Sequence, residues 1–377
     1  MVDKMDVKYL KISEKYKQRI KSKENNALKR KINPAGLIEG PSVASRKDCP
    51  IIENIEKNHT PSEIQTNEAK EYKNEDKKNN KLDEHKAEVK DTKKFPRLVG
   101  IKNFKVNCYI NASLQCLLCI PELSDYFLEK RFTQINYETK SQQRSICNIM
   151  TEWYEGIFYS NREIISPKAF VNMCPSGEQD AHEFFFNTLF PLIQKETDCS
   201  IKIQRDDTWN SEQVWDWYRN VSRNIFDELF GGLYKNTIVC GKCEYNSVTY
   251  DPFLGISLAI SGSCLYDCLD KEFKKEKLPK CVGYKCFKCE DKTPATRREK
   301  IEKAPKYLIL HLKRLIKNSR KVSDHVRYPI TLNLSDYFVD KNKNITYDLI
   351  AVCVHLGQSN GGHFYSLGKR NKKVIRV

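Results

Sequence analysis

The residues of this chain that could perform chemistry are chiefly its 15 cysteines and seven histidines. Cys108 opens the stretch CYINASLQCLLCI, in which apolar residues recur at helical spacing, and Pro121 follows it and discourages continuation. A helix N-terminus and a nearby imidazolium favour the thiolate, which is the nucleophilic form of a cysteine. Cys108 is therefore a candidate nucleophile. The alternative is a buried thiol, because most free cysteines behave as small hydrophobic residues.

A histidine on a distant segment would have to serve as the base. His363 lies in QSNGGHFYSL, where a glycine-rich turn leads directly into an expected strand. Such a junction suits an imidazole that must face a cleft. His355 is the rival, but its mid-strand position in VCVHLG favours a structural role.

Four further cysteines form two C-x-x-C pairs, Cys240 with Cys243 and Cys286 with Cys289. Each pair offers two thiolates to one metal ion, and two such pairs complete a tetrahedron around Zn²⁺. Because 42 residues separate the pairs, the intervening strands must fold back. The alternative is two chance pairs of buried thiols. We expect a structural zinc with no open position for water.

The elements that must position these groups come in two blocks. Residues 109–120, 145–159, 179–195 and 212–231 are predicted as helices from their apolar periodicity. After Leu233 the pattern changes to strands, in TIVC, SVTYDPFLGISLAI, KYLILHLKRL, YDLIAVCVHL and HFYSLGK. Helices followed by strands indicate an α+β fold.

Residues 1–95 differ from the rest of the chain in composition. They contain 23 Lys and Arg, 17 Asp and Glu and a single Phe. Such a segment buries too little apolar surface to offset its chain entropy, so we predict a disordered, charged arm. Residues 4–31 are its most basic part and could bind nucleic acid or direct nuclear import, although a solubilising tail is the reading we favour.

The formal charge of +16 favours acidic partners without indicating a fold. No apolar run approaches the length of a membrane span, and the N-terminus does not resemble a secretory signal, so we expect no membrane association. Without a secretory signal, the cysteines are expected to be reduced, in the cytoplasm, the nucleus or both.

Several segments in register resemble the sequence boxes of the ubiquitin-specific proteases, which are papain-like deubiquitinating cysteine peptidases. The family's cysteine box, G-L-x-N-x-G-N-T-C-Y-x-N-S-x-L-Q, is matched at Gly100, Ile101, Asn103, Cys108, Tyr109, Asn111, Leu114 and Gln115. Its second box, Q-D-A-x-E-F, is matched at Gln179, Asp180, Ala181, Glu183 and Phe184. Its histidine box is matched at Tyr347, Leu349, Ala351, Val352, His355, Gly357, Gly362, His363 and Phe364. NIFDELFGG and PKYLILHLKRL also match, and the resemblance covers about residues 97–370.

The resemblance implies a thiol protease that hydrolyses the (iso)peptide bond after the C-terminal glycine of ubiquitin. Cys108 would attack the carbonyl, His363 would carry the proton, and the amide of Asn103 would donate to the oxyanion. The domain would comprise a thumb (about 96–230), zinc-bearing fingers (about 231–300) and a palm (about 301–377). We expect a monomer that binds ubiquitin and ubiquitinated proteins, with nucleic acid an improbable partner.

The chain departs from the family pattern around both catalytic boxes. Lys105, Val106 and Asn107 replace Gly-Asn-Thr before the nucleophile, which removes easy access to positive φ and predicts a looser oxyanion site. Phe364 and Leu367 stand where tyrosines are common, and both substitutions look tolerable as core positions.

The region after the histidine box also departs from the family. The sequence ends at Val377, without the family's tryptophan, its orienting acid or asparagine, or its usual C-terminal strands. Asn371 could substitute as the orienting group. Three explanations stay open: a truncated gene product, a weak Cys-His dyad enzyme, or an inactive ubiquitin-binding relative. A nucleic-acid-binding zinc protein would explain the charge but not the ordered boxes.

Acidic residues near the second box are candidates for holding the basic tail of ubiquitin. Glu178, Asp180 and Glu183, together with Asp251, could line such a channel. The alternative is that they are ordinary solvated residues or helix caps.

Overall fold

The part of the protein described by the structure follows the charged N-terminal arm. The computed structural model describes residues 96–104, 106–134, 145–174, 180–197, 204–279, 284–316, 320–358, 361–370 and 373–376. These residues belong to one compact unit, Pro50–Val377, whereas the arm predicted over 1–95 lies outside the described residues. Within the described ranges, no helix is both long and apolar enough to cross a membrane.

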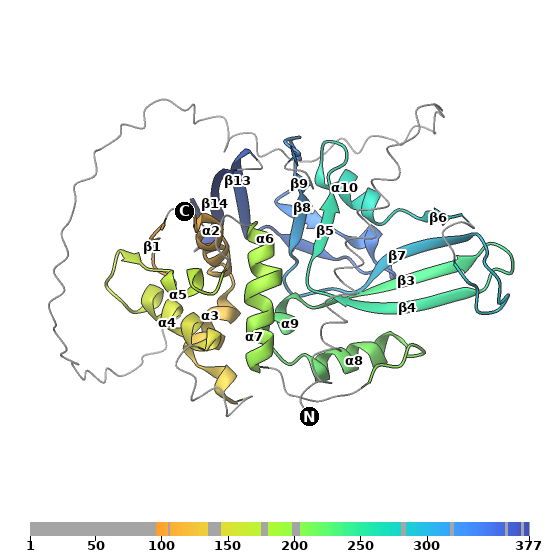
Figure 1. The fold of residues 1–377 in the computed structure, drawn as a ribbon, viewed down its shortest axis with the longest axis horizontal. Helices are drawn as coiled ribbons and strands as arrows, with labels where there is room; N and C mark the ends of the chain where they lie inside the picture. Colours follow the sequence, from red (N-terminus) through yellow and green to blue (C-terminus); the bar gives the residue numbers. More distant parts are fainter. Residues whose placement is uncertain are drawn as a thin grey trace. The chain divides into compact units, whose positions relative to one another are not determined.

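Helices make up most of the first half of the described chain (Figure 1). They are α2 (Cys108–Leu117), α3 (Pro121–Leu128), η1 (Arg131–Gln134), α4 (Ile146–Phe158), α5 (Lys168–Val171), α6 (Ala181–Glu183), α7 (Phe190–Thr197), α8 (Ser211–Val221) and α9 (Ile225–Phe230). A π-helical segment, η3 (Phe184–Leu189), joins α6 to α7. The helices predicted over 109–120, 145–159 and 179–195 are therefore confirmed, with shifted ends.

The single helix predicted over 212–231 is wrong, because the chain breaks between α8 and α9. Asn224 has extended backbone, and its side chain accepts hydrogen bonds from the backbone N–H groups of Phe226 and Asp227. An asparagine in this role begins a new helix rather than continuing the old one. Pro121 similarly separates α2 from α3, where it occupies the first turn.

Aromatic side chains fill the core of the helical half. Tyr154 of α4 stacks on Phe127 of α3 with ring centroids 5.6 Å apart, and both side chains are fully buried. Phe190 of α7 stacks on Phe226 of α9 at 4.3 Å. The carboxylate of Glu196 in α7 accepts hydrogen bonds from the N-terminal backbone of α4, including one of 2.7 Å from the Ile146 N–H. Packing and capping thus fix the helices against one another.

The second half consists mainly of strands. They are β3 (Gly232–Cys240), β4 (Asn246–Phe253), β5 (Ile256–Ala259), β6 (Glu276–Leu278), β7 (Ala295–Lys303), β8 (Leu310–Lys313), β9 (Leu315–Ile316), β10 (Arg320–Lys321), β11 (Thr331–Asn333), β12 (Thr346–Asp348), β13 (Ala351–Gln358), β14 (Gly361–Arg370) and β15 (Lys373–Arg376). A further short pair, β1 (Gly100–Ile101) and β2 (Ile164–Ile165), precedes them, and a 3₁₀ turn, η5, covers Ser335–Tyr337.

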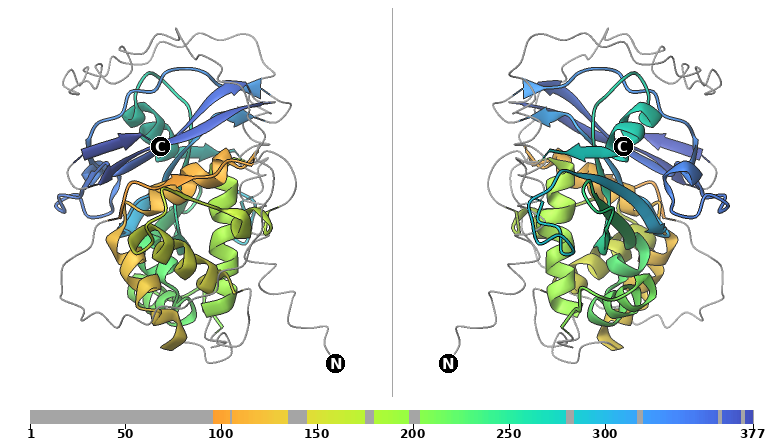
Figure 2. Two further views of the ribbon diagram at one scale, coloured as in Figure 1. Left: turned by 90° about the vertical axis from the view of Figure 1, so that its left-hand side faces the viewer. Right: turned by 90° about the vertical axis from the view of Figure 1, so that its right-hand side faces the viewer.

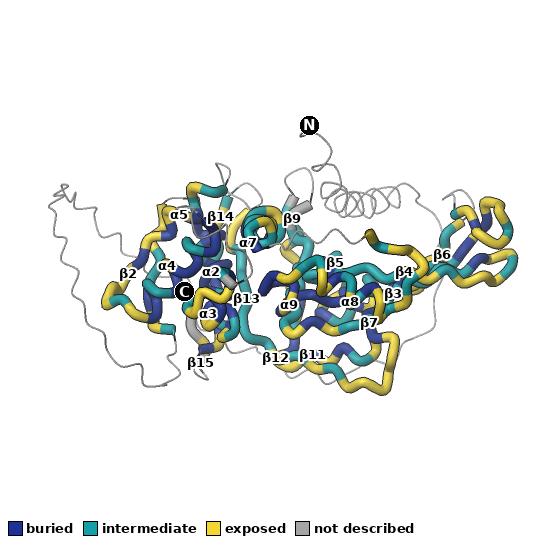
Figure 3. Tube along the Cα trace, turned by 90° about the horizontal axis from the view of Figure 1, so that it is seen from below, coloured by how far each residue is buried: buried dark blue, intermediate teal, exposed yellow. Residues whose placement is uncertain are grey.

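The largest sheet is antiparallel and has the strand order β4-β3-β7-β6. Its base packs against a second hydrophobic cluster, in which Tyr234 stacks on Phe253 at 4.1 Å. Helix α10 (Leu265–Glu272), which the sequence pattern did not predict, covers this cluster with Leu265, Cys268 and Leu269. Away from the base the edge strand β4 is exposed at Asn246, Val248 and Thr249, whereas most of β3 stays intermediate in burial (Figure 3).

The C-terminal sheet has the order β13-β14-β15, and both of its pairings are antiparallel. The register sets Leu356 opposite His363 and Leu367 opposite Arg376. The expectation that strands after the histidine box would be missing is therefore wrong in part, because β15 pairs with β14. Together the helices and sheets confirm the α+β prediction.

Candidate functional site

Cys108 is the first residue of α2 and is buried, with 6% of its surface exposed. Helix α2 packs against β14 and, less extensively, against β13, and the ribbon views show it beside these strands (Figures 1 and 2). The C-terminal half of this contact is fixed by Arg370, whose guanidinium donates a 2.9 Å hydrogen bond to the Gln115 carbonyl. The structure thus joins the cysteine-bearing helix to the histidine-bearing hairpin.

Asn107, a departure from the family pattern, and Asn111, a matched position of the cysteine box, organise the loop before Cys108. The buried Asn107 accepts a 2.5 Å hydrogen bond from the Phe104 N–H and donates to the Asn111 side chain at 2.8 Å. Asn111 in turn donates to the Lys102 carbonyl at 3.3 Å. Asn103, the predicted oxyanion donor, lies exposed on the same loop, while Lys105 lies outside the described residues. Asn107 therefore supplies side-chain bonds that hold this loop together where the family pattern has threonine.

If Cys108 is the nucleophile, replacing Asn107 with alanine is expected to lower the rate of its reaction with an acyl substrate by about 10- to 100-fold, because a misplaced loop weakens oxyanion stabilisation. The loss of a buried hydrogen-bonding side chain should also cost about 1–3 kcal/mol of stability. Steady-state kinetics and urea unfolding of the variant measure the two effects. Asn107→Thr, the family residue, should restore part of the rate, whereas a rate unchanged in Asn107→Ala would show that the loop positions itself without this side chain.

The two candidate histidines lie on opposite faces of the β13–β14 hairpin. Successive residues of a strand alternate between faces, so His355, Phe364 and Ser366 share one face, and His363 lies on the other. The first face packs on the helices, because Phe364 joins the helical core and Ser366 is buried. His363 is exposed. The structure therefore brings α2 and β14 together without placing the His363 ring on the strand face that contacts α2.

His355 is more enclosed than His363. Its ring lies 4.5 Å from that of Phe364, and Lys321 donates hydrogen bonds to the backbone carbonyls of His355 and Gly357. Gly357 has a φ of +112°, a conformation that favours glycine at this turn. Asn371, the residue considered as a third catalytic group, lies outside the described residues.

The acidic residues predicted to line a channel for the ubiquitin tail occupy different environments. Asp180 caps α6 by accepting a 2.7 Å hydrogen bond from the His182 N–H, and Glu183 is exposed. Asp251 of β4 accepts from the Asn236 side chain at 2.7 Å and pairs with Arg205 at 3.5 Å. Glu178 lies outside the described residues. Of the three described acids, Asp180 caps a helix and Asp251 forms an ion pair, whereas Glu183 takes part in none of these contacts.

A pair of histidines joins α6 to the neighbouring strands, a feature that the sequence did not reveal. The rings of His182 and His311 stack with centroids 3.9 Å apart. Ser257 of β5 lies 3.4 Å from His182 Nε2 and 3.2 Å from His311 Nδ1, so one hydroxyl links both imidazoles. Burial, followed by repulsion from His311 and Lys313 and opposed by Asp180, lowers the pKa of His182 to about 3. Burial and Lys313 lower the pKa of His311 to about 4. Both rings are therefore neutral at pH 7.

This pair predicts a loss of stability on acidification. A histidine in the unfolded chain binds a proton below about pH 6.5, whereas His182 and His311 do not do so in the folded state until about pH 3 and about pH 4. Their stabilisation is complete above pH 6.5 and falls as the pH drops below it, by at most about 2 kcal/mol per histidine at pH 5. Urea unfolding at pH 7, 6 and 5 measures the slope, and the double variant His182→Gln/His311→Gln should flatten it. An equal slope in the two proteins would contradict the prediction.

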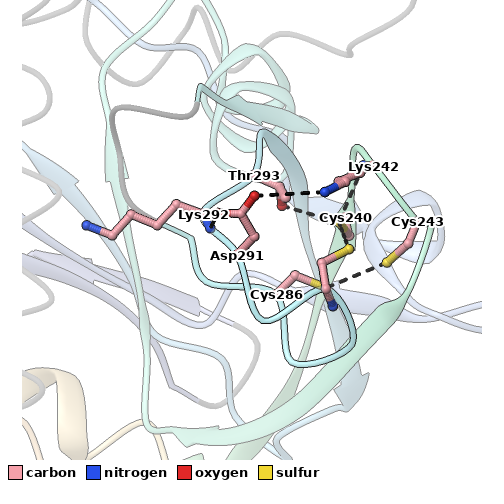
Figure 4. Close-up of polar contacts among 8 residues, drawn as sticks. Cys240, Lys242, Cys243, Cys286, Asp291, Lys292 and Thr293 are labelled. Carbon is pink, nitrogen blue, oxygen red and sulfur yellow. Dashed lines mark hydrogen bonds and ion pairs between the residues drawn. The ribbon is translucent and has the colours of Figure 1, made fainter.

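The four cysteines of the C-x-x-C pairs form a cluster at the end of the β3–β4 and β7 strands (Figure 4). All four sulfurs lie within 4.8 Å of one another. The closest contacts across the pairs are 3.9 Å between Cys240 and Cys289 and 3.7 Å between Cys243 and Cys286. The structure thus brings together the four residues predicted as metal ligands, and the cluster could hold a metal ion.

The chemistry of this donor set fits a tetrahedral ion. Sulfurs bound to zinc at about 2.3 Å stand about 3.8 Å apart, which agrees with the distances across the pairs. The N–H groups of Lys242 and Cys289 point at Cys240 Sγ and Cys286 Sγ, each at 3.4 Å. Hydrogen bonding from Thr293 lowers the pKa of Cys240 to about 6, whereas the adjoining thiols raise that of Cys289 to about 12. A dication bound among the sulfurs would favour the thiolate form of all four cysteines.

Cys240→Ser is expected to abolish metal retention and to destabilise the distal end of the four-stranded sheet. Removing one of four ligands of a closed structural site withdraws much of the folding free energy that the metal supplies. Elemental analysis of the purified protein should give about one zinc per parent chain and less than about a tenth of that in the variant. Cys264→Ser, which changes a cysteine outside the cluster, serves as the control. Unchanged metal content in Cys240→Ser would refute the site.

The sequence of this chain is similar to those of known proteins. The family model described as ubiquitin carboxyl-terminal hydrolase matches residues 99–375. The Drosophila melanogaster ubiquitin carboxyl-terminal hydrolase Usp2 is 30% identical over 293 residues, covering 72% of this chain and 31% of that protein. The probable ubiquitin carboxyl-terminal hydrolase 16 of Schizosaccharomyces pombe is 29% identical over 289 residues, covering 74% of this chain and 61% of its own length. The chain thus spans less than two thirds of either relative.

Solved structures give the same assignment. A yeast SAGA DUB module aligns with a TM-score of 0.61 and 26% identity, covering 78% of this chain and 67% of the other. A SAGA DUB module containing Ubp8 and bound to monoubiquitin aligns with a TM-score of 0.61 and 25% identity, covering 78% and 68%. The fold is that of the α+β cysteine peptidases of the ubiquitin-specific type. With most of its described residues matched by the family model, the chain belongs to the ubiquitin carboxyl-terminal hydrolase family.

Proposed function

We propose that this protein is a deubiquitinating thiol protease that cleaves the (iso)peptide bond after the C-terminal glycine of ubiquitin. The observation that carries the proposal is the position of Cys108, the first residue of a helix packed on the hairpin that bears His363. The family membership and the structural similarity to a ubiquitin-bound DUB module support the same reaction. The thumb, fingers and palm correspond in this proposal to the helical half, the four-stranded sheet with its cysteine cluster, and the remaining strands.

In the proposed reaction, Cys108 Sγ attacks the carbonyl carbon after transferring its proton to His363. The tetrahedral oxyanion is held by donors of the loop before α2, with the Asn103 amide as one of them. His363 then protonates the leaving lysine amine, and the C–N bond breaks. Water, deprotonated by His363, hydrolyses the thioester and releases the ubiquitin carboxylate.

His363 is the base in this proposal because it is solvent-accessible and follows two glycines, Gly361 and Gly362. A group that exchanges protons with a substrate must be reachable from the cleft. Glycines immediately before it give the backbone the freedom to turn the ring toward the sulfur.

The remaining parts of the proposal concern the metal, the assembly and the compartment. The four-cysteine cluster holds Zn²⁺ with a structural role, and ubiquitin and its conjugates bind a monomeric chain. A reducing compartment, the cytoplasm or the nucleus, agrees with the 12 described cysteines, none of which forms a disulfide. Gel filtration with light scattering and imaging of the tagged chain test the assembly and the compartment.

A ubiquitin probe with an electrophilic C-terminus tests the central claim. We expect a covalent adduct at Cys108, located by peptide mass spectrometry, together with hydrolysis of a fluorogenic ubiquitin amide. Tight binding of ubiquitin without labelling or turnover would make the protein an inactive ubiquitin receptor instead. If the chain neither binds ubiquitin nor is labelled by the probe, the proposal that ubiquitin is its substrate is wrong.

A further inference from the structure

One face of the four-stranded sheet carries an unusual concentration of positive charge around a concavity. The concavity has a volume of ≈ 360 Å³. Its lining contains no carboxylate, and five of its residues are cationic: Lys235, Lys275, Arg298, Lys300 and Lys341. These five come from β3, from the segment before β6, from β7 and from the segment after η5. Four separate stretches of chain therefore direct positive charge toward one place.

The strand register makes this arrangement unfavourable for the sheet alone. Lys235 of β3 lies directly opposite Lys300 of β7, and Thr237 lies opposite Arg298. Like charges facing each other across an antiparallel pair are destabilising. The other face of the same strands is balanced differently, because Asn236 lies opposite the buried Glu299. Arg297 also lies on that other face, opposite Ile238 and beside Glu299, whereas the residues of the two paired strands that line the concavity include three cations and no acid.

Neighbouring cations have carboxylate partners, whereas the five of the concavity are in none of the ion pairs of the described residues, and Lys300 donates only to the backbone carbonyl of Asp336. Lys303, at the end of β7, pairs with Glu212 at 2.5 Å, and Lys242 pairs with Asp291 at 3.9 Å. None of the ion pairs found among the described residues involves a cation of the concavity. Burial, followed by repulsion from Arg298 and Lys341, lowers the pKa of Lys300, and only Asp336 opposes this. A bound anion would relieve a repulsion that the protein itself leaves unbalanced.

The shape and the chemistry of the lining indicate the class of ligand. The volume is within the range of small-molecule pockets, and the apolar Val239, Phe338 and Val339 form part of its wall. Lysine and arginine side chains bind phosphate groups through charge-assisted hydrogen bonds, and the threonine hydroxyls beside them can add neutral ones. Because the cations converge instead of following a stripe, several phosphates on one compact ring fit better than a polymer.

We propose that this concavity binds a polyphosphorylated small molecule of the inositol polyphosphate class. The binding does not require the proposed protease activity. It assigns a role to the excess of positive charge in this half of the protein, which the basic tail of ubiquitin does not explain. Nucleic acid presents the same phosphate chemistry on an extended backbone, and the experiment separates the two sources.

Calorimetric titration of the full chain with inositol hexakisphosphate at about 150 mM salt tests the proposal. We expect a single site with a Kd of about 10 μM or tighter. Arg298→Gln and Lys300→Gln should each weaken binding about tenfold, and the double variant by more. Lys303→Gln is the matched control, because Lys303 lies on the same strand but pairs with Glu212 outside the concavity.

Three results would overturn the proposal. The first is the absence of binding by the parent chain. The second is an equal loss of affinity in Lys303→Gln, which would reduce the effect to general surface charge. The third is tighter binding of a DNA duplex of about 20 base pairs that is lost in the same two variants, which would assign the face to nucleic acid. Thermal unfolding of each variant confirms that a lost affinity does not reflect a lost fold.

Discussion

Cys108→Ala is expected to reduce hydrolysis of a fluorogenic ubiquitin amide by roughly 10⁴-fold or more while leaving ubiquitin affinity within a few-fold of the parent value. Removing the sulfur eliminates the thioester intermediate, so only binding and oxyanion stabilisation remain to accelerate the reaction. Cys108 is buried at the start of α2, so alanine removes a small side chain and no hydrogen bond of the loop network. Progress curves measure turnover, and fluorescence anisotropy with labelled ubiquitin measures binding.

Cys116→Ala provides the matched control, because Cys116 lies on the same helix two turns further on. Burial, reinforced by Cys353 and Cys119 and opposed by Arg370, raises the pKa of its thiol well above the usual value, which keeps it protonated and unreactive. We expect this variant to retain activity within about threefold of the parent chain. If Cys116→Ala lost activity and Cys108→Ala retained it, the nucleophile would be Cys116, and the mechanism built on Cys108 would be wrong.

The parts of the site that the sequence could predict are those determined locally. The helix beginning at Cys108 follows from apolar spacing and from Pro121, and both features act within a few residues. The four-cysteine cluster follows from spacing as well, because two residues between cysteines suit bidentate binding whatever the rest of the fold does. Both predictions are confirmed in the structure as placements of residues, and the identity of the metal stays a prediction.

The parts that the sequence could not predict depend on contacts between distant segments. His182 and His311 are 129 positions apart, and nothing in either segment indicates that their rings stack across Ser257. Asn107 looked like a departure from a family motif, yet its contacts with Phe104 and Asn111 hold the loop. In each case the tertiary contact determines the role of the side chain, and local propensity carries no information about it.

The face on which a strand residue lies is another property that one segment alone does not determine. Periodicity shows that neighbours alternate, but only packing shows which set is buried. For the β13–β14 hairpin, the buried set includes Phe364 and Ser366, whose partners across the strands are His355 and Cys353. The sequence therefore could name both histidines as candidates and could not show that they point in opposite directions. The choice between them is a question for experiment.

His363→Gln is expected to lower kcat/KM for the fluorogenic substrate by about 10²–10⁴-fold, because a thiol without its base loses both general-base and general-acid catalysis. Ubiquitin affinity should change little, since glutamine keeps the size and polarity of an exposed side chain. His355→Gln should instead reduce activity by less than about tenfold and lower stability by about 1 kcal/mol, since its ring packs on Phe364. Kinetics of both variants across pH 5 to 9 also locate the base, because the acid limb of the profile should disappear only in the variant that lacks it.

A larger loss of activity in His355→Gln than in His363→Gln would indicate that His355 is the base. His355 shares the hairpin face with Phe364 and Ser366, the face that packs on the helical core. If His355→Gln removed the acid limb and His363→Gln did not, the base would be the histidine already on the side of the nucleophile, and His363 would be a surface residue of the turn. If His363→Gln removes it, the ring must turn toward Cys108 when ubiquitin binds, and Gly361 and Gly362 become its hinge. Gly361→Ala, whose added carbon meets no other atom within 4 Å, should then reduce activity in the same assay by restricting that movement without a clash in the hairpin.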